Sequence, residues 1–277
     1  MVRYLLKRWC SVPADQITET AGDFGCFSDA KTTLASYKFR TILSQKSEAS
    51  DHIQAIGYES LCWFKRSPTL PGAPWVAVPW EMGSPVNYRS ASEPFTFYRA
   101  RAHVVEGSFS AGVTRISMVA NTIRVNYDWD PRTNTYGDQL YVTPTGSRVY
   151  SGGAFTTSSS LQTLCSTSQG LYGTKELVVS LKMVVDPATA SSVLSRLVGL
   201  RALPRIRVKF RTFVNAYDLN RGHVIGFSAD WDSRLKYPRF GSDGTWAGKL
   251  FRVVSVQRLR ESPVQYGVEA VEIETEP

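Results

Sequence analysis

The stretch from Val184 to Phe213, VVDPATASSVLSRLVGLRALPRIRVKFRTF, predicts a helix followed by a strand. Asp186 is a favourable N-cap, because its carboxylate can accept hydrogen bonds from the free backbone N–H groups of the first turn. Pro187 suits the first helical position, where its missing N–H is not needed. Apolar residues then recur at the spacing of one helical face, at Ala190, Val193, Leu194, Leu197 and Val198.

The second half of this stretch changes period. Pro204 forbids continuation of the helix and favours extended backbone before it. Apolar and basic residues then alternate, with Ile206, Val208 and Phe210 between Arg205, Arg207, Lys209 and Arg211. This alternation predicts a half-buried strand with a basic outer face.

Length and charge place broad limits on the protein. With 277 residues, the chain is long enough for one large or two ordinary domains. It has no apolar run of about 18 residues and no signal-peptide pattern, so we expect no membrane span and a cytoplasmic origin. The net charge of +8 fits a nucleic acid, an acidic surface or an acidic protein partner, and it equally fits ordinary solvated basicity. The acidic end 269–276 could pair with the basic strand within a sheet or between subunits.

The order of the predicted elements indicates an α+β fold that is mainly β. We expect a small α+β domain at 1–85, a Pro/Ser-rich linker at 86–94, and a β-rich domain with a small barrel or sandwich at 95–277. Alternation predicts strands at 113–118 and 121–127. The Gly/Ser/Thr-rich stretch 143–170 is typical of a long surface loop.

The sequence shows little catalytic chemistry. It has three histidines and no Gly-rich phosphate loop, nucleophile elbow or HExxH pattern. Asp128 and Asp130 could be the paired carboxylates of a glycoside hydrolase, although a polar strand end entering a turn explains them more simply; Asp230 and Asp232 present the same choice. We therefore expect no enzyme activity, catalytic residue, metal or cofactor.

Four cysteines and four aromatic residues are the remaining candidates for a metal site or a binding surface. Cys10, Cys26, Cys62 and Cys165 form no CxxC pair and have no histidine at zinc spacing, so we expect thiols. Aromatic rings at Trp231, Tyr237, Phe240 and Trp246 are the candidates for exposed contacts with a partner or a carbohydrate. Core packing is the alternative for any of them.

Several short motifs resemble, in the right order, those of one family. Residues 121–127 (NTIRVNY) are similar to its N-x-I-x-V-x-Y strand, and 168–173 (SQGLYG) to its S-x-x-x-Y-G entry. Residues 186–190 (DPATA) resemble its D-x-A-T-A helix start, and Leu203–Arg205 the P-R before the next strand. Residues 219–228 resemble L-x-x-G-D-V-V-x-L-S with His223 where Asp is usual, and 248–253 resemble G-x-x-F-R-V. Upstream, 27–30 and 53–56 resemble an inserted α+β module.

This family is the baseplate hub, or central tail-tip, proteins of tailed phages and gene transfer agents. The resemblance implies small β-barrel domains with an inserted α+β domain, arranged as a homotrimer around the DNA exit channel of the virion tail. The implied partners are further copies of the chain, the distal tail or tube protein, the tape-measure protein, and fibre or receptor-binding proteins, with non-specific passage of DNA. The alternative is a carbohydrate- or receptor-binding tail module that uses the aromatic loop 231–246, and a cell-wall hydrolase that uses the Asp pairs is a third hypothesis.

Overall fold

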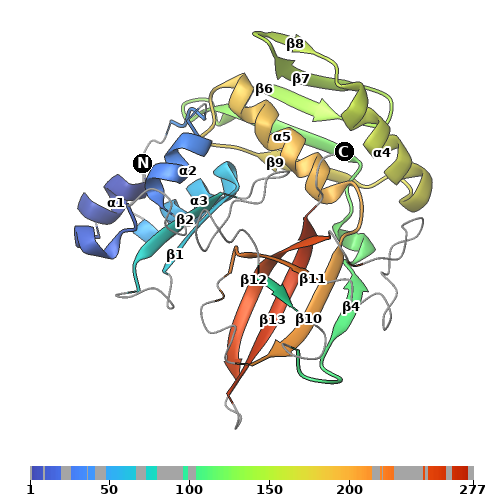
Figure 1. Cartoon of the computed structure of the whole chain (residues 1–277). Coiled ribbons are helices and arrows are strands. Elements are labelled where there is room, and N and C mark those ends of the chain that lie inside the picture. The colour runs from blue at the N-terminus through green and yellow to red at the C-terminus, as the bar shows by residue number, and fades with distance from the viewer. Residues whose placement is uncertain are drawn as a thin grey trace. The chain divides into compact units, whose positions relative to one another are not determined.

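The computed structural model (Figure 1) describes residues 2–8, 10–19, 26–35, 37–40, 48–66, 73–79, 96–98, 104–213, 219, 221–227, 246, 249–259 and 264–273. Its contacts divide the chain into two compact units, each built from three stretches of sequence. Unit 1 comprises Met1–Ser11, Ala30–Phe64 and Arg115–Pro204. Unit 2 comprises Val12–Asp29, Lys65–Thr114 and Arg205–Pro277.

Unit 1 contains a five-stranded sheet covered by two helices. Its strands are β5 (Thr122–Asp130), β6 (Thr135–Val142), β7 (Ser147–Ser151), β8 (Ala154–Thr156) and β9 (Glu176–Ser180), in the order β8-β7-β6-β5-β9. β5 pairs with β9 in parallel, and the other pairs are antiparallel. The helix α4 (Ser159–Tyr172) lies between β8 and β9 in the chain, and the helix α5 (Pro187–Arg201) follows β9. Figure 1 shows α5 lying across the sheet.

The predicted helix α5 is confirmed and lies at the centre of the core of unit 1. Asp186 caps it, since one carboxylate oxygen accepts from the Thr189 N–H and from the Thr189 hydroxyl, each at 3.0 Å. The apolar face predicted from the sequence is buried against β5, β6 and β7. Leu194 is fully buried and Leu197 is 7% exposed. Packing of this face, rather than helix propensity, therefore holds the helix in place.

The N-terminal part of the chain adds three helices, α1 (Val2–Arg8), α2 (Phe27–Thr33) and α3 (Ala49–Ser60). In unit 1, Glu59 at the end of α3 is buried and accepts from the Lys182 N–H at 3.0 Å and the Met183 N–H at 2.8 Å. Phe39 forms an antiparallel bridge with Val184 close by. These contacts attach Phe39 and the end of α3 to the turn that leads into α5.

Unit 2 contains a six-stranded sheet in the order β3-β11-β12-β13-β10-β4. Its strands are β3 (Thr96–Tyr98), β4 (Ser110–Val113), β10 (Ile206–Thr212), β11 (Val224–Phe227), β12 (Leu250–Leu259) and β13 (Gln265–Ile273). β12 and β13 form the long antiparallel hairpin expected from the sequence. The short strands β1 (Cys62–Arg66) and β2 (Trp75–Pro79) form a separate two-stranded sheet.

The prediction of an α+β fold that is mainly β is confirmed, because strands outnumber helices among the described residues. Barrel or sandwich closure stays a prediction. The domain limits 1–85, 86–94 and 95–277 also stay a prediction, and the linker lies outside the described residues.

Two local predictions are wrong. The stretch 143–170 is not a loop, since it forms β7, β8 and most of α4. Its serines and threonines have low helix propensity, but tertiary packing overrides that preference by burying Cys165 and Ser168. The strand predicted at 113–118 ends at Val113, and a short 3₁₀ helix, η2 (Ile116–Met118), follows.

Candidate functional site

The basic strand β10 has the predicted alternation. Its burial alternates strictly, and Arg207, Lys209 and Arg211 are exposed. Arg205, immediately before the strand, does not belong to this face, since only 8% of it is exposed. Its guanidinium donates to the Glu272 carbonyl at 3.1 Å. Three of the four predicted basic residues are therefore exposed on the surface of unit 2.

The acidic strand β13 lies next to β10 and pairs with it in an antiparallel register. Lys209 is directly opposite Glu269, with their charged atoms 3.2 Å apart. Arg207 also forms an ion pair with Glu269. Within-sheet pairing, one of the two predicted alternatives, therefore accounts for Glu269 and neutralises part of the basic face.

The aromatic candidates divide between the core and the part of the chain that is not described. Trp231, Tyr237 and Phe240 lie outside the described residues. Trp246 is fully buried, with its ring centroid 5.4 Å from Phe227 and 6.0 Å from Phe251. The expectation that Trp246 is exposed is therefore wrong, because its ring fills the core of unit 2.

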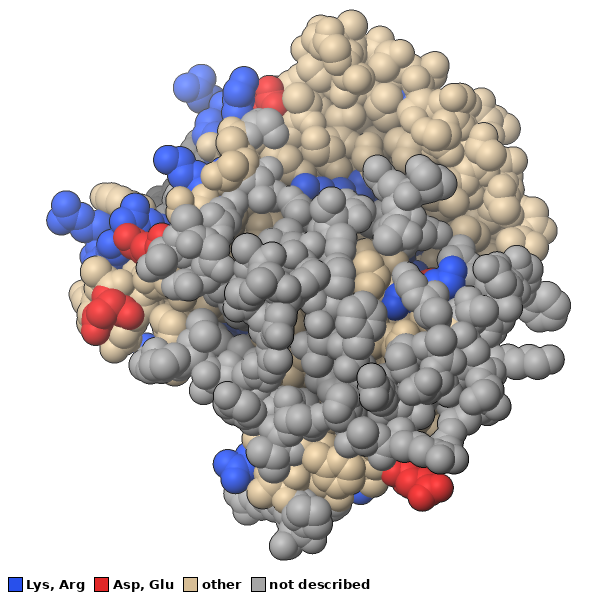
Figure 2. Space-filling view, viewed as in Figure 1, with Lys and Arg blue, Asp and Glu red and all other residues tan. Residues whose placement is uncertain are grey.

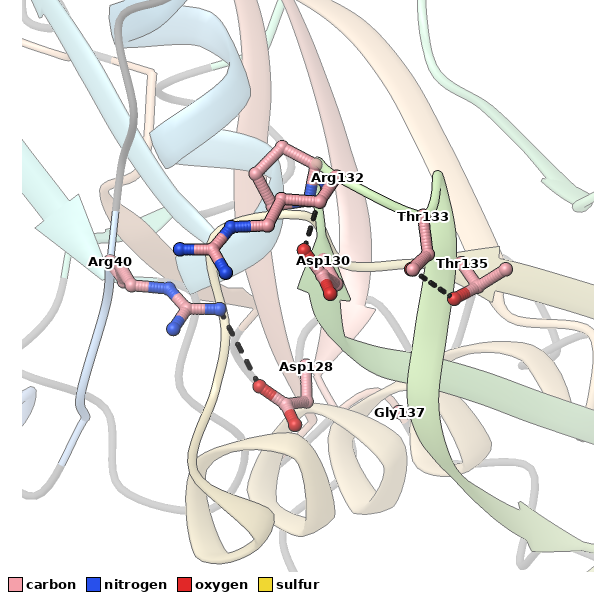
Figure 3. Close-up of a pocket in the computed structure, with 8 residues that line it drawn as sticks. Arg40, Asp128, Asp130, Arg132, Thr133, Thr135 and Gly137 are labelled. Carbon is pink, nitrogen blue, oxygen red and sulfur yellow. Dashed lines mark hydrogen bonds and ion pairs between the residues drawn. The ribbon is translucent and has the colours of Figure 1, made fainter.

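A pocket of about 480 Å³ lies in unit 1, at the turn between β5 and β6 (Figure 3). Its lining includes Arg40, Asp128, Asp130, Arg132, Thr133 and Thr135. Figure 3 shows the guanidinium groups of Arg40 and Arg132 and the two carboxylates around a common space. The structure thus brings both aspartates identified from the sequence into one pocket, together with arginines that the sequence analysis did not find.

Each carboxylate already has one contact with the protein. An Asp128 oxygen lies 3.6 Å from the Arg40 guanidinium, and this guanidinium also donates to the Trp129 carbonyl at 3.0 Å. One Asp130 oxygen accepts from the Arg132 N–H at 2.9 Å, which is a turn-forming interaction. The turn interpretation of Asp130 is therefore correct, although both carboxylates still face the pocket.

The backbone around Asp128 has an unusual conformation. Asp128 has a φ of 58°, in the left-handed region that few side chains other than Asn and Asp adopt. Across the hairpin stands Gly137, where an added Cβ would lie 2.7 Å from an Asp128 carboxylate oxygen. The missing side chain at 137 leaves space for the Asp128 carboxylate.

Next to this pocket, Tyr127, Asp138 and Arg148 form a hydrogen-bonded group on β5, β6 and β7. The Tyr127 hydroxyl donates to Asp138 at 2.9 Å, and two Arg148 nitrogens donate to the same carboxylate. The hydrogen bonds from Arg148 lower the pKa of Asp138 to about 2. Burial, followed by the bond to Asp138, raises the pKa of Tyr127. This group links three strands and is a structural feature rather than a reactive one.

The cysteines have free thiols in the structure. Cys26, Cys62 and Cys165 are buried, and Cys10 is exposed. Within the described residues, no group of three or more His, Cys, Asp or Glu side chains could hold a metal ion. No helix in the same part of the chain is long and apolar enough to cross a membrane.

Comparison with known proteins finds similarity only among solved structures. No family model matches the sequence, and no curated protein matches it. The chain is similar to a protein in the virion of a native gene transfer agent particle, with 12% identity and a TM-score of 0.48 over 82% of this chain and 39% of that one.

It is also similar to the prophage tail protein gp18 of Listeria monocytogenes EGD-e, with 11% identity and a TM-score of 0.41 over 86% of this chain and 56% of that one. The chain thus spans well under two thirds of either protein. Similarity at this level assigns neither a family nor a function.

Proposed function

We propose that the chain is a structural protein of a phage tail, a subunit of the tail tip or baseplate hub. In this role it joins the tail tube to the distal receptor-binding parts and surrounds the channel through which DNA leaves. It acts without catalysis and is located in the virion tail after assembly in the host cytoplasm. Its partners are further copies of itself, as a trimer, and the distal tail or tube, tape-measure, and fibre or receptor-binding proteins.

The observation that carries this proposal is the structural position of the motifs that resemble the hub family. The N-x-I-x-V-x-Y motif forms the start of β5, whose Ile123 and Val125 are fully buried. The D-x-A-T-A motif supplies the cap of α5. His223, the departure from the family pattern, is buried immediately before β11. These three motifs therefore coincide with an element boundary or a core position, so at these places the resemblance extends to residues with a defined structural role.

The exposed basic residues of β10 are compatible with a surface that faces another subunit or DNA. Arg207, Lys209 and Arg211 project from one face of the six-stranded sheet. Phosphate charge would attract such a face without any reading of sequence. A ring of subunits would in addition need heterologous contacts that close by rotation.

Light scattering of the purified chain at several concentrations and salt levels tests the proposal first. We expect a trimer whose mass does not change on dilution. Labelled antibody imaging of intact particles from the same source then tests the location, with labelling expected at the tail tip. Absence of the chain from the particles would overturn the proposal, even if the isolated protein forms a trimer.

A further inference from the structure

The pocket at the β5–β6 turn presents opposite charges to one space without pairing them fully. Arg40 and Asp128 are in contact, as described above, at 3.6 Å. The Arg132 guanidinium has no hydrogen bond or ion pair within the described part of the chain, and only one Asp130 oxygen accepts a bond there. Figure 3 shows the Arg132 guanidinium extending toward that of Arg40. One guanidinium and one carboxylate oxygen are thus left for another molecule.

The backbone that carries Asp128 and Arg40 is fixed by hydrogen bonds within the protein. The backbone N–H of Asp128 donates to the Val184 carbonyl at 2.9 Å, and that of Arg40 donates to the Met183 carbonyl at 2.6 Å. The positive φ of Asp128 and the missing Cβ at Gly137 direct a carboxylate into the space. A residue in a sparsely populated backbone region is a recognised feature of functional sites. Preorganised groups bind a ligand at a smaller entropic cost than mobile ones.

The mixture of charges decides the class of ligand. A simple anion would be repelled by two carboxylates, and a metal cation by two guanidinium groups. An apolar molecule would leave the Arg132 guanidinium and the second Asp130 oxygen without partners. A molecule with both an acidic group and hydroxyl groups satisfies every partner, because guanidinium binds carboxylate or phosphate and a carboxylate accepts from hydroxyls. The hydroxyls of Thr133 and Thr135, 2.7 Å apart, add further donors and acceptors.

The volume of the pocket agrees with such a ligand. About 480 Å³ lies within the range of roughly 300–1,000 Å³ that is usual for small-molecule sites. We propose that this pocket binds an acidic saccharide, a sugar that carries a carboxylate or phosphate group. The acidic group lies between Arg40 and Arg132, and the ring hydroxyls donate to Asp128 and Asp130. This inference uses only unit 1 and is independent of the proposed role in a phage tail.

The test is an NMR titration of the ¹⁵N-labelled full-length chain, followed at the backbone amide of Gly137. The probes are D-glucuronate, D-glucose 6-phosphate, D-glucose, acetate, inorganic phosphate and L-alanine. We expect saturable shifts with glucuronate or glucose 6-phosphate, and a comparison of the two shows whether the site prefers carboxylate or phosphate. D-Glucose, acetate and inorganic phosphate should bind about tenfold more weakly, because each lacks one half of the recognised chemistry.

Two variants show whether the pocket itself is responsible. Arg132→Gln should weaken binding of the acidic sugar about tenfold or more, because a hydrogen-bonded charge is lost without disturbing a bond within the protein. Arg115→Gln, an exposed arginine outside the pocket, is the matched control and should bind normally. Asp130→Asn keeps the oxygen that accepts from the Arg132 N–H and should weaken binding, because the negative charge is lost and the second oxygen becomes an NH2 group that cannot accept from a hydroxyl.

Several results would overturn the proposal. These are no saturable shift with either acidic sugar, equal shifts with acetate or phosphate alone, binding of alanine only, or binding that Arg132→Gln leaves unchanged. Alanine binding alone would assign the pocket to a zwitterion such as an amino acid or a peptide end.

Discussion

At the scale of single residues, Asp138 shows how one carboxylate supports three strands. It accepts from Tyr127 on β5 and from Arg148 on β7, while it belongs to β6 itself. Tyr127 is 3% exposed, so bulk water is a poor replacement for Asp138 as the partner of its hydroxyl. The loss of an acceptor for such a group is costlier than the net value of the bond it made.

Asp138→Ala should therefore lower the free energy of unfolding by about 1–3 kcal/mol, because it leaves the Tyr127 hydroxyl without an acceptor. Asp138→Asn should lower the free energy of unfolding by a smaller amount. It loses the ion pair with Arg148, but the Asn oxygen still accepts a hydrogen bond from Tyr127. Urea denaturation at neutral pH measures both. Equal losses in the two variants would mean that charge, and not the buried hydroxyl, matters.

The same residue makes a contribution to stability that depends on pH. Hydrogen bonds from Arg148 lower the pKa of Asp138 from 3.8 to about 2. A carboxyl group whose pKa is lower in the folded state stabilises the fold above its unfolded pKa, and this stabilisation is lost as the pH falls toward the folded value. We expect the unfolding free energies of the wild type and Asp138→Asn to converge between about pH 4 and pH 2. A difference that is constant with pH would contradict this assignment.

The cysteines give a further prediction for single residues. Burial raises the pKa of Cys165 to about 11, and the thiolate is the reactive form. Exposed Cys10 should therefore react with N-ethylmaleimide in the native protein at pH 7.5, whereas Cys165 should react only after unfolding. Peptide mass spectrometry after timed labelling measures both rates. In Cys10→Ser, fast labelling should disappear.

At the scale of elements, the helix α5 combines a local signal with a buried surface. The apolar period and the Asp186 cap specify the helix, and the sheet of unit 1 covers its apolar face. Leu197 lies on that face and is buried, whereas Leu171 at the end of α4 is 65% exposed. The two leucines form a matched pair for measuring the contribution of burial.

Leu197→Ala should lower the free energy of unfolding by about 2–5 kcal/mol, because it removes buried methyl groups and leaves a cavity. Leu171→Ala should change it by no more than about 0.5 kcal/mol, since an exposed surface position loses little packing. Thermal and urea unfolding of the full chain give both values. A similar loss in both variants would show that α4 packs its exposed leucine against something else in solution.

At the scale of the whole molecule, the net charge is unevenly distributed. Unit 1 contains 15 Lys and Arg against 8 Asp and Glu, whereas unit 2 contains 17 against 16. On the face shown in Figure 2, basic atoms gather at the left, where Figure 1 places α1. α1 itself carries Arg3, Lys7 and Arg8. We therefore expect binding to polyanions to depend mainly on unit 1. Strand β10 should contribute more when its ion pairs with Glu269 of β13 are removed.

Glu269→Gln should raise the salt concentration at which the protein elutes from heparin, because Glu269 forms ion pairs with both Arg207 and Lys209. Glu176→Gln is the matched control, since it makes the same change in net charge but releases Arg124 alone, which lies 3.0 Å away. Glu269→Gln should therefore have the larger effect. Equal effects would indicate that only the net charge matters and that β10 does not contact the polyanion.

Local periodicity determined much of this protein from its sequence alone. The cap at Asp186, the helix of α5, the stop at Pro204 and the alternation of β10 all depend on residues a few positions apart, so they can be read without knowledge of the rest of the chain. The basic and acidic strands and the Asp128–Asp130 pair could be found in the same way. Their partners could not, because pairing depends on register and topology.

Only the tertiary structure decided features that join distant residues. Arg40 reaches Asp128 across 88 positions, and nothing in either segment signals the other. Trp246 is buried because Phe227 and Phe251 surround it, although its local sequence is typical of an exposed loop. Residues 143–170 form strands and a helix because burial of Cys165 and its neighbours outweighs the weak propensities of serine and threonine. Contacts between distant segments bury apolar surface and pair charges, and their free energy exceeds the local preferences that a sequence pattern reports.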